Sequence, residues 1–140
     1  MRAESSAARH RAGHGSGMRG AIRVEPDPPM TPEQRIEAFR AFVTKSPDDA
    51  FARYSLAMAL RTAGRGADAA AEFEELRRRR PEYVPTYLML GQTLETLGRD
   101  AHAAQAYEDG IAQAARGNDM HARSELEQAL EAVRARGAAR

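Results

Sequence analysis

The sequence contains no cysteine, which excludes disulfide bonds, thiolate zinc sites and cysteine nucleophiles together. No apolar run approaches the roughly 20 residues that a membrane-spanning helix requires. A large net charge is also missing, because 21 Lys and Arg side chains oppose 20 Asp and Glu side chains. A nucleic acid would therefore need a local cluster of cations. We expect a cytoplasmic protein that does not associate with a membrane.

Side chains that carry chemistry are equally sparse. Zinc requires three or four converging ligands. The four histidines are His10, His14, His102 and His121, and no two of them lie at metal-ligand spacing on one predicted helix. The few Ser and Thr side chains lack the neighbouring base and the glycine-rich elbow of an activated nucleophile. The sequence thus predicts no catalytic residue, no metal and no cofactor, and we do not expect an enzyme.

Residues 1–29 differ from the rest of the chain in composition. They are rich in Gly, Ser, Arg and His, and Ile22 and Val24 are their only large aliphatic side chains. So little apolar surface cannot offset the conformational entropy lost on folding, so we expect a disordered tail. Met18 and Met30 are alternatives to the first residue as initiator, and the intact mass of the natural protein would distinguish them.

The remaining sequence repeats itself with a period of 34 residues. The pairs at this separation are Pro47 and Pro81, Leu56 and Leu90, Leu60 and Leu94, Gly64 and Gly98, Ala69 and Ala103, and Phe73 and Tyr107. Between the glycines and prolines, large side chains recur at helical spacing, without the alternating β-branched runs of strands. The glycines fit helix C-caps and the prolines fit the breaks between units. Each unit is therefore predicted to consist of two helices.

These positions resemble the tetratricopeptide repeat, whose 34-residue pattern combines Leu-Gly, Tyr, Ala-x-x-x-Phe and Pro. The second unit carries Gly91, Ala103 and Tyr107 at the matching places. Arg53 and Ala115 depart from the pattern, because a bulky apolar residue and a proline are usual there. The resemblance implies an all-α, right-handed solenoid of about six antiparallel helices, which binds another protein or a peptide without catalysis.

Both ends of the array extend this scheme. The sequence predicts a helical domain over residues 30–136, with a leading helix at 32–45, full units at about 50–83 and 84–117, and a capping helix at 120–136. The leading helix matches the second helix of a unit that lacks its first, and two inserted residues around Gly117 precede the capping helix. Glu127 stands at the small position of Gly91, which suits the polar outer face of a terminal cap.

In the family that the chain resembles, the first helices of successive units line a concave face on which ligands dock. The side chains of these helices that packing leaves free are the candidate groove residues: Tyr54, Met58, Arg61, Leu88, Gln92, Glu95, Gln128 and Glu131. Alternatively, Tyr54, Met58 and Leu88 belong partly to the core. The subclass that binds acidic chaperone tails uses Lys and Asn where this chain has Tyr54, Met58 and Met89. The groove therefore favours a helix or peptide with apolar anchors.

The run Arg77–Arg80 is the strongest cluster of positive charge. It indicates either weak nucleic-acid binding or the ordinary neutralisation of a helix C-terminus, with pairing to preceding glutamates. The second interpretation is preferred, because no aromatic side chains alternate with the arginines as they do in single-strand binders. Self-assembly into a homo-oligomer through the exposed ends of the array is a further alternative.

Overall fold

The computed structural model of the chain describes residues 25–26 and 28–139. Over these residues the protein is all-α, without a strand, and its six helices are α2 (Pro32–Lys45), α3 (Ala50–Thr62), α4 (Gly66–Arg79), α5 (Pro85–Thr96), α6 (Asp100–Arg116) and α7 (Met120–Ala138). The predicted fold class and number of helices are confirmed. The disordered tail predicted over residues 1–29 lies almost entirely outside the described residues.

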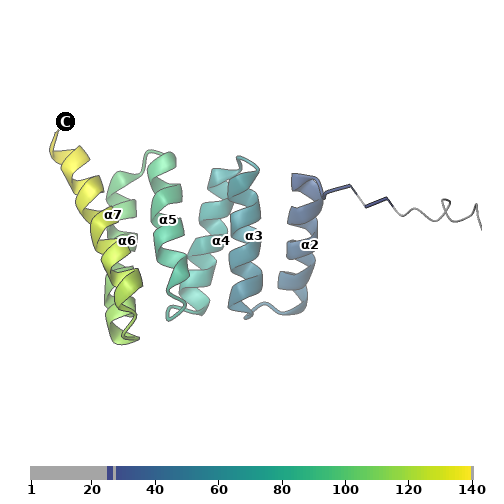
Figure 1. Cartoon of the computed structure of the whole chain (residues 1–140), viewed down its shortest axis with the longest axis horizontal. Coiled ribbons are helices and arrows are strands. Elements are labelled where there is room, and N and C mark those ends of the chain that lie inside the picture. The colour runs from purple at the N-terminus through teal and green to yellow at the C-terminus, as the bar shows by residue number, and fades with distance from the viewer. Residues whose placement is uncertain (1–24, 27, 140) are drawn as a thin grey trace, which may run out of the picture.

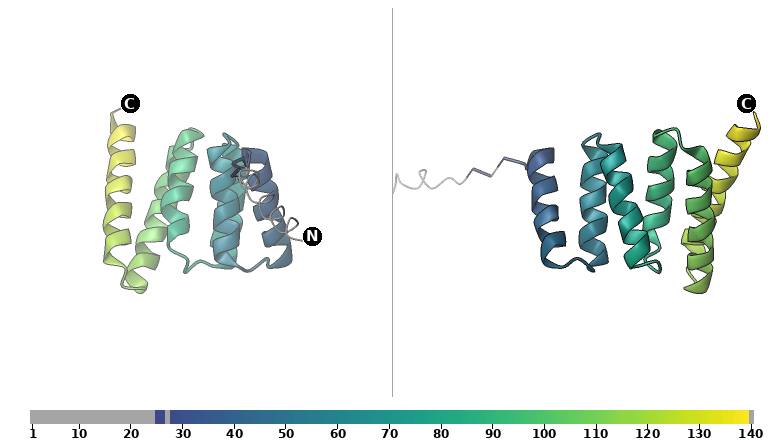
Figure 2. Two further views of the ribbon diagram at one scale, coloured as in Figure 1. Left: turned by 45° about the vertical axis from the view of Figure 1, so that its right-hand side comes forward. Right: turned by 180° about the vertical axis from the view of Figure 1, so that it is seen from behind.

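The helices stand side by side in the order of the chain, with α2 at one end and α7 at the other (Figures 1 and 2). Each helix packs on its neighbours in sequence, and α5 also reaches α7. Successive units thus bury one continuous core between them, as a solenoid does. α2 packs mainly on α3, so among the described residues one long side of α2 has no helix against it.

Side chains at three helix starts satisfy backbone N–H groups that have no partner within the helix. At α2, the Thr31 hydroxyl accepts from the Gln34 N–H (3.1 Å), and the Gln34 side chain accepts from the Thr31 N–H (2.9 Å). Asp49 and Asp119 cap α3 and α7 by accepting a backbone N–H three residues on, at 3.0 and 3.1 Å. Polar residues before each apolar stretch therefore determine where these helices begin.

Residues in the left-handed region end α3, α5 and α6. They are Gly64 (φ 80°), Gly98 (φ 76°) and Asn118 (φ 58°). The N–H of the next residue donates back to a carbonyl of the last helical turn, at 2.9, 2.8 and 2.8 Å respectively. This arrangement is the Schellman motif, in which glycine avoids the steric cost of a Cβ and asparagine tolerates it.

α6 is longer than the equivalent helix α4, with 17 residues against 14. α4 ends before Pro81, because proline has no N–H to donate and clashes with the preceding turn. Ala115 occupies the corresponding place on α6 and lets this helix run to Arg116. The insertion expected around Gly117 therefore lengthens α6, and the connection to α7 is shorter than the one that follows α4.

Two glycines let α5 and α6 approach each other closely. A Cβ on Gly91 of α5 would lie 2.1 Å from the Tyr107 ring, and a Cβ on Gly110 of α6 would lie 2.4 Å from Cβ of Tyr87. Tyr87 and Tyr107 are both fully buried. Each helix thus supplies a tyrosine that fills the space left by a glycine on the other, and this reciprocal packing sets the distance between the helices.

Arg53, one departure from the repeat pattern, is buried with 8% of its surface exposed. Its guanidinium donates to Glu72 Oε1 at 2.7 Å and to the Pro47 carbonyl at 3.2 Å. Tyr87, at the same place one unit later, donates its hydroxyl to the Pro81 carbonyl at 2.6 Å. Arg53 therefore makes the contact that a tyrosine makes elsewhere, and Glu72 balances the charge that it brings into the interior.

Gly91→Ala is expected to destabilise the protein by about 2–3 kcal/mol, because the added methyl group overlaps a buried ring that cannot move aside. Thermal unfolding followed by circular dichroism would show a clearly lower Tm. Gly137→Ala is the matched control, since a Cβ there meets nothing within 4 Å, and it should leave Tm equal or slightly higher. A Tm for Gly91→Ala equal to that of the wild type would contradict the close packing of α5 on α6.

Candidate binding surface

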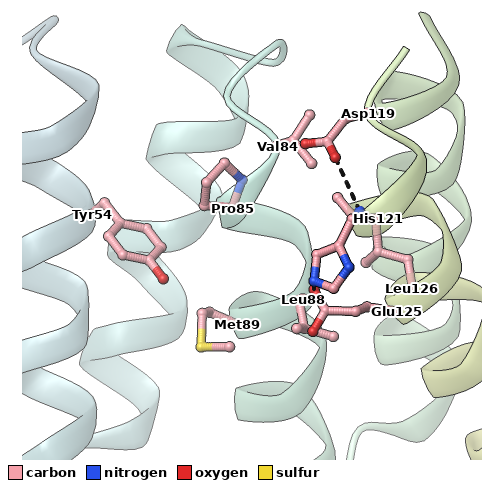
Figure 3. A pocket seen from close by; sticks show the side chains of 10 residues that line it. Tyr54, Val84, Pro85, Leu88, Met89, Asp119, His121, Glu125 and Leu126 are labelled. Atoms are coloured by element: carbon pink, nitrogen blue, oxygen red, sulfur yellow. Dashed lines mark hydrogen bonds and ion pairs between the residues drawn. The ribbon is translucent and has the colours of Figure 1, made fainter. Parts of the chain in front are cut away.

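A hollow of about 300 Å³ opens on the face formed by α3, α5 and α7 (Figure 3). We name it the central hollow, and its lining residues are Tyr54, Val84, Pro85, Leu88, Met89, Asp119, His121, Ala122, Glu125 and Leu126. All of them belong to the first helices of the units or to the residue directly before one. The repeat thus brings alternate helices to one shared face, and α4 and α6 contribute nothing to its lining.

Three side chains form an apolar floor in the central hollow. Tyr54, Leu88 and Met89 are partly buried and pack against the core. The Tyr54 ring lies edge-on to Phe73 and Tyr83, with centroids 6.0 and 5.8 Å away, and burial raises the pKa of its hydroxyl. These contacts hold the ring in one place, and its remaining surface faces the hollow across from α7 (Figure 3).

The edge of the central hollow that α7 provides is polar and carries negative charge. Asp119 and Glu125 lie on this edge together with His121, whose side chain is 87% exposed. Glu125 lies 3.6 Å from the imidazole, and Asp119 accepts the Ala122 N–H that caps the helix. A bound group beside this edge would meet carboxylates that are open to solvent.

A series of polar side chains continues along the same helices. Arg61 of α3 donates to Met89 Sδ and to Gln92 Oε1 of α5, both at 3.2 Å. Glu95 of α5 accepts the Tyr107 hydroxyl and an Nη2–H of Arg136 on α7, the latter at 2.8 Å. Burial and the Glu95 carboxylate both raise the pKa of Tyr107. These contacts tie the first helices to one another across the units.

The structure brings some of the predicted groove residues together and separates others. Tyr54 and Leu88 line the central hollow, while Met58 is packed against the core and takes no part in the lining. Gln128 is exposed on α7. Glu131 lines a different depression, formed by α6 and α7, which also includes Ile111 and Leu130. Participation of all eight residues in binding stays a prediction.

Several lining residues were missed by the sequence interpretation, which considered only two or three positions on each first helix. Met89 and Glu125 are equivalent residues, as are Pro85 and His121, because the offset between α5 and α7 is 36 residues. Carrying the repeat alignment through the first two turns of each helix would have found them. The sequence gives no comparable signal for the depth of the hollow, which depends on how far the helices diverge.

The arginines of the run Arg77–Arg80 are all paired with acidic groups. Arg77 contacts Glu74 (2.5 Å) and Asp109 (3.2 Å), and Arg78 and Arg79 both bind Glu75. Arg79 and Arg80 also reach Asp48 and Glu82, at 2.8 and 2.6 Å respectively. These ion pairs favour the interpretation in which the run closes a helix C-terminus and joins neighbouring units, since little unpaired positive charge is left for a polyanion.

Neither metal chemistry nor membrane insertion is indicated by the described part of the chain. Within residues 25–26 and 28–139, no three His, Asp or Glu side chains gather as metal ligands would. No helix in these ranges is both long and apolar enough to cross a bilayer. The chemistry that the central hollow offers is the recognition of apolar surface and of positive charge.

A family profile described as a tetratricopeptide repeat matches residues 36–84 and 54–119. A TPR repeat-containing protein of Pseudomonas aeruginosa is 31% identical over 91 residues, which cover 65% of this chain and 87% of the relative. A tetratricopeptide repeat domain protein from Salinibacter ruber has a TM-score of 0.59 and 36% identity, covering 61% of this chain and 97% of its own. PcrH, solved with the chaperone binding region of PopD, has a TM-score of 0.71 and 16% identity, covering 97% and 96%.

Paired helices around a continuous core, with the first helices sharing one hollowed face, define the protein as an α-solenoid. The profile match and the relative from Pseudomonas aeruginosa identify the family. The chain belongs to the tetratricopeptide repeat family. At 16% identity, the likeness to PcrH concerns the fold alone.

Acid should weaken the pairing at the end of α4, where hydrogen bonds from Arg78 and Arg79 lower the pKa of Glu75 from 4.5 to about 2. Because the pKa is lowered in the folded state, the stabilisation is complete above pH 4.5 and is lost as the pH falls towards 2. We expect Glu75→Gln to lower Tm above pH 4.5, with the difference from wild type disappearing near pH 2.

Thermal unfolding of both proteins across this pH range provides the measurement. Glu131→Gln, on the exposed surface of α7, controls for the change in net charge. A Tm difference for Glu75→Gln that did not depend on pH would show that the ion pairs with Arg78 and Arg79 are not its cause.

Proposed function

We propose that the protein is a non-catalytic adaptor that binds a peptide or helix of another protein in the central hollow. The observation that carries the proposal is the apolar floor, since Tyr54, Leu88 and Met89 pack against the core and are still partly open to solvent. An open apolar surface within a concave site is typical of a binding site. Methionine adds adaptability, because its unbranched side chain fits ligands of different shape.

The charges around the apolar floor favour one orientation of a bound ligand. Asp119 and Glu125 lie on the α7 edge. On the side of α3, the two hydrogen bonds of the Arg61 guanidinium go to the neutral atoms Met89 Sδ and Gln92 Oε1. A ligand with an apolar anchor, a Lys or Arg towards α7 and an acidic group towards Arg61 would complement all three regions.

The relatives support a peptide as the kind of ligand. PcrH was solved with a segment of PopD, and a domain of yeast Sti1 was solved in a complex with Hsp70. This chain shares only the fold with these proteins, at 16% and 17% identity. Tyr54, Met58 and Met89 stand where an acidic chaperone tail would need basic or amide groups, so a different peptide chemistry is proposed here.

Selection of random peptides displayed on phage against the immobilised protein tests the proposal. We expect enriched sequences that place an apolar residue next to Lys or Arg. Leu88→Glu should weaken binding of the selected peptides by about tenfold or more, because it puts a charge on the apolar floor. Fluorescence anisotropy with labelled peptides would give the Kd of each variant.

Ala112→Glu is the matched control, since Ala112 is exposed on α6 and lies outside the central hollow. It introduces the same charge and should leave the Kd unchanged. If Leu88→Glu kept full affinity, or if both variants lost it equally, binding would take place somewhere other than the central hollow.

A further inference from the structure

The side of α2 that faces away from α3 is apolar and exposed. Phe42 of α2 is 60% exposed and Phe51, at the start of α3, is 67% exposed. At the places equivalent to Phe42 in the following units, Leu76 is 1% exposed and Gly110 is buried against Tyr87. The same position is therefore buried wherever both helices of a unit are described, and α2 exposes it because no helix precedes α2 among the described residues (Figure 1).

A hollow of about 170 Å³ on this side is lined by Phe39, Phe42, Asp49, Phe51 and Ala52, and we name it the end hollow. One unit later, the corresponding space receives the ring of Tyr54. That ring lies against Phe73 and Tyr83, which are the equivalents of Phe39 and Asp49. The internal repeat thus indicates that the end hollow suits an aromatic ring carried by a helix antiparallel to α2.

Few parts of the chain can provide that ring. Residues 1–30, which precede α2 in the sequence, contain no Phe, Tyr or Trp. α7 is a first helix without its second, but it has Ser124 at the place of Tyr54 and presents the ion pair of Arg123 and Glu127. Among the described residues, the exposed aromatic side chains are Phe42 and Phe51 themselves.

The charges of α2 suit antiparallel pairing with a copy of itself. Glu33, Arg35 and Glu37 lie in its first half, which carries a net negative charge, and Arg40 and Lys45 lie in its second half. Lys45 has no ion-pair partner within the described part of the chain. In an antiparallel pair, the basic half of each helix would lie beside the acidic half of the other, which favours this orientation over the parallel one.

We propose that two copies of the chain pair through α2 about a two-fold axis, with Phe42 and Phe51 of each copy against the end hollow of the other. Each copy then supplies the antiparallel helix that the other lacks. Such a contact is self-complementary and closed, so assembly stops at the dimer. The proposal goes beyond the adaptor function, because the central hollow shares no residue with the end hollow.

Sedimentation velocity of the full chain over a wide concentration range tests the dimer. We expect a reversible shift from monomer to dimer for the wild type. Phe42→Glu should raise the dimer Kd by at least about a hundredfold, because it places a carboxylate in a contact that excludes water. Met120→Glu, an exposed apolar residue at the other end of the array (54% exposed), should leave the Kd unchanged. Circular dichroism at a concentration below the dimer Kd, where all three proteins are monomers, would check that both variants keep the wild-type Tm.

Charge exchange tests the antiparallel arrangement. Lys45→Glu and Glu37→Lys should each weaken the dimer by about tenfold, and the double variant should recover most of the affinity. A wild-type chain that stayed monomeric at all concentrations would overturn the proposal. So would open-ended oligomers, or a dimer that Phe42→Glu left intact, since both would mean that α2 of one copy does not pack on α2 of another.

Discussion

The packing of a tyrosine on one helix against a glycine on its partner is the constraint on which the array depends. It holds α5 and α6 so close that no side chain fits at Gly91 or Gly110. In the first unit, α3 and α4 pack closely with other residues at these positions. Ala57 replaces Gly91, and the pair Tyr87 and Gly110 is replaced by Arg53 and Leu76.

The replacement of Tyr87 by Arg53 depends on the replacement of Gly110 by Leu76. A tyrosine at position 53 would meet the larger Leu76, whereas the flexible arginine bends towards Glu72 and the Pro47 carbonyl. The buried guanidinium of Arg53 and its two hydrogen bonds are therefore explained by the size of Leu76. Arg53 departs from the repeat pattern because Leu76 occupies the space that glycine leaves open in the second unit.

The helices and their order could be predicted because the repeat period is encoded locally, by glycines in left-handed turns, prolines at the breaks and apolar residues at helical spacing. The extension of α6 could not, because the missing proline at position 115 permits a longer helix without determining how the inserted residues are shared between helix and turn. For the site, spacing predicted Tyr54 and Leu88. It did not predict the acidic edge at Glu125, because that edge faces the floor only once α7 is placed against α5.

The terminal helices of the described array, α2 and α7, differ in the surface that they expose. A solenoid needs a polar outer face where it stops. α7 carries many exposed charged side chains, and its Arg134 and Arg136 bind Glu108 of α6 and Glu95 of α5. α2 instead leaves Phe42 in solvent and ends in a hollow that an aromatic ring would fill. Among the described residues, the exposed aromatic side chains gather at the α2 end, so in the proposed dimer two copies cover each other's phenylalanines, and no second surface of this kind is left to add a third.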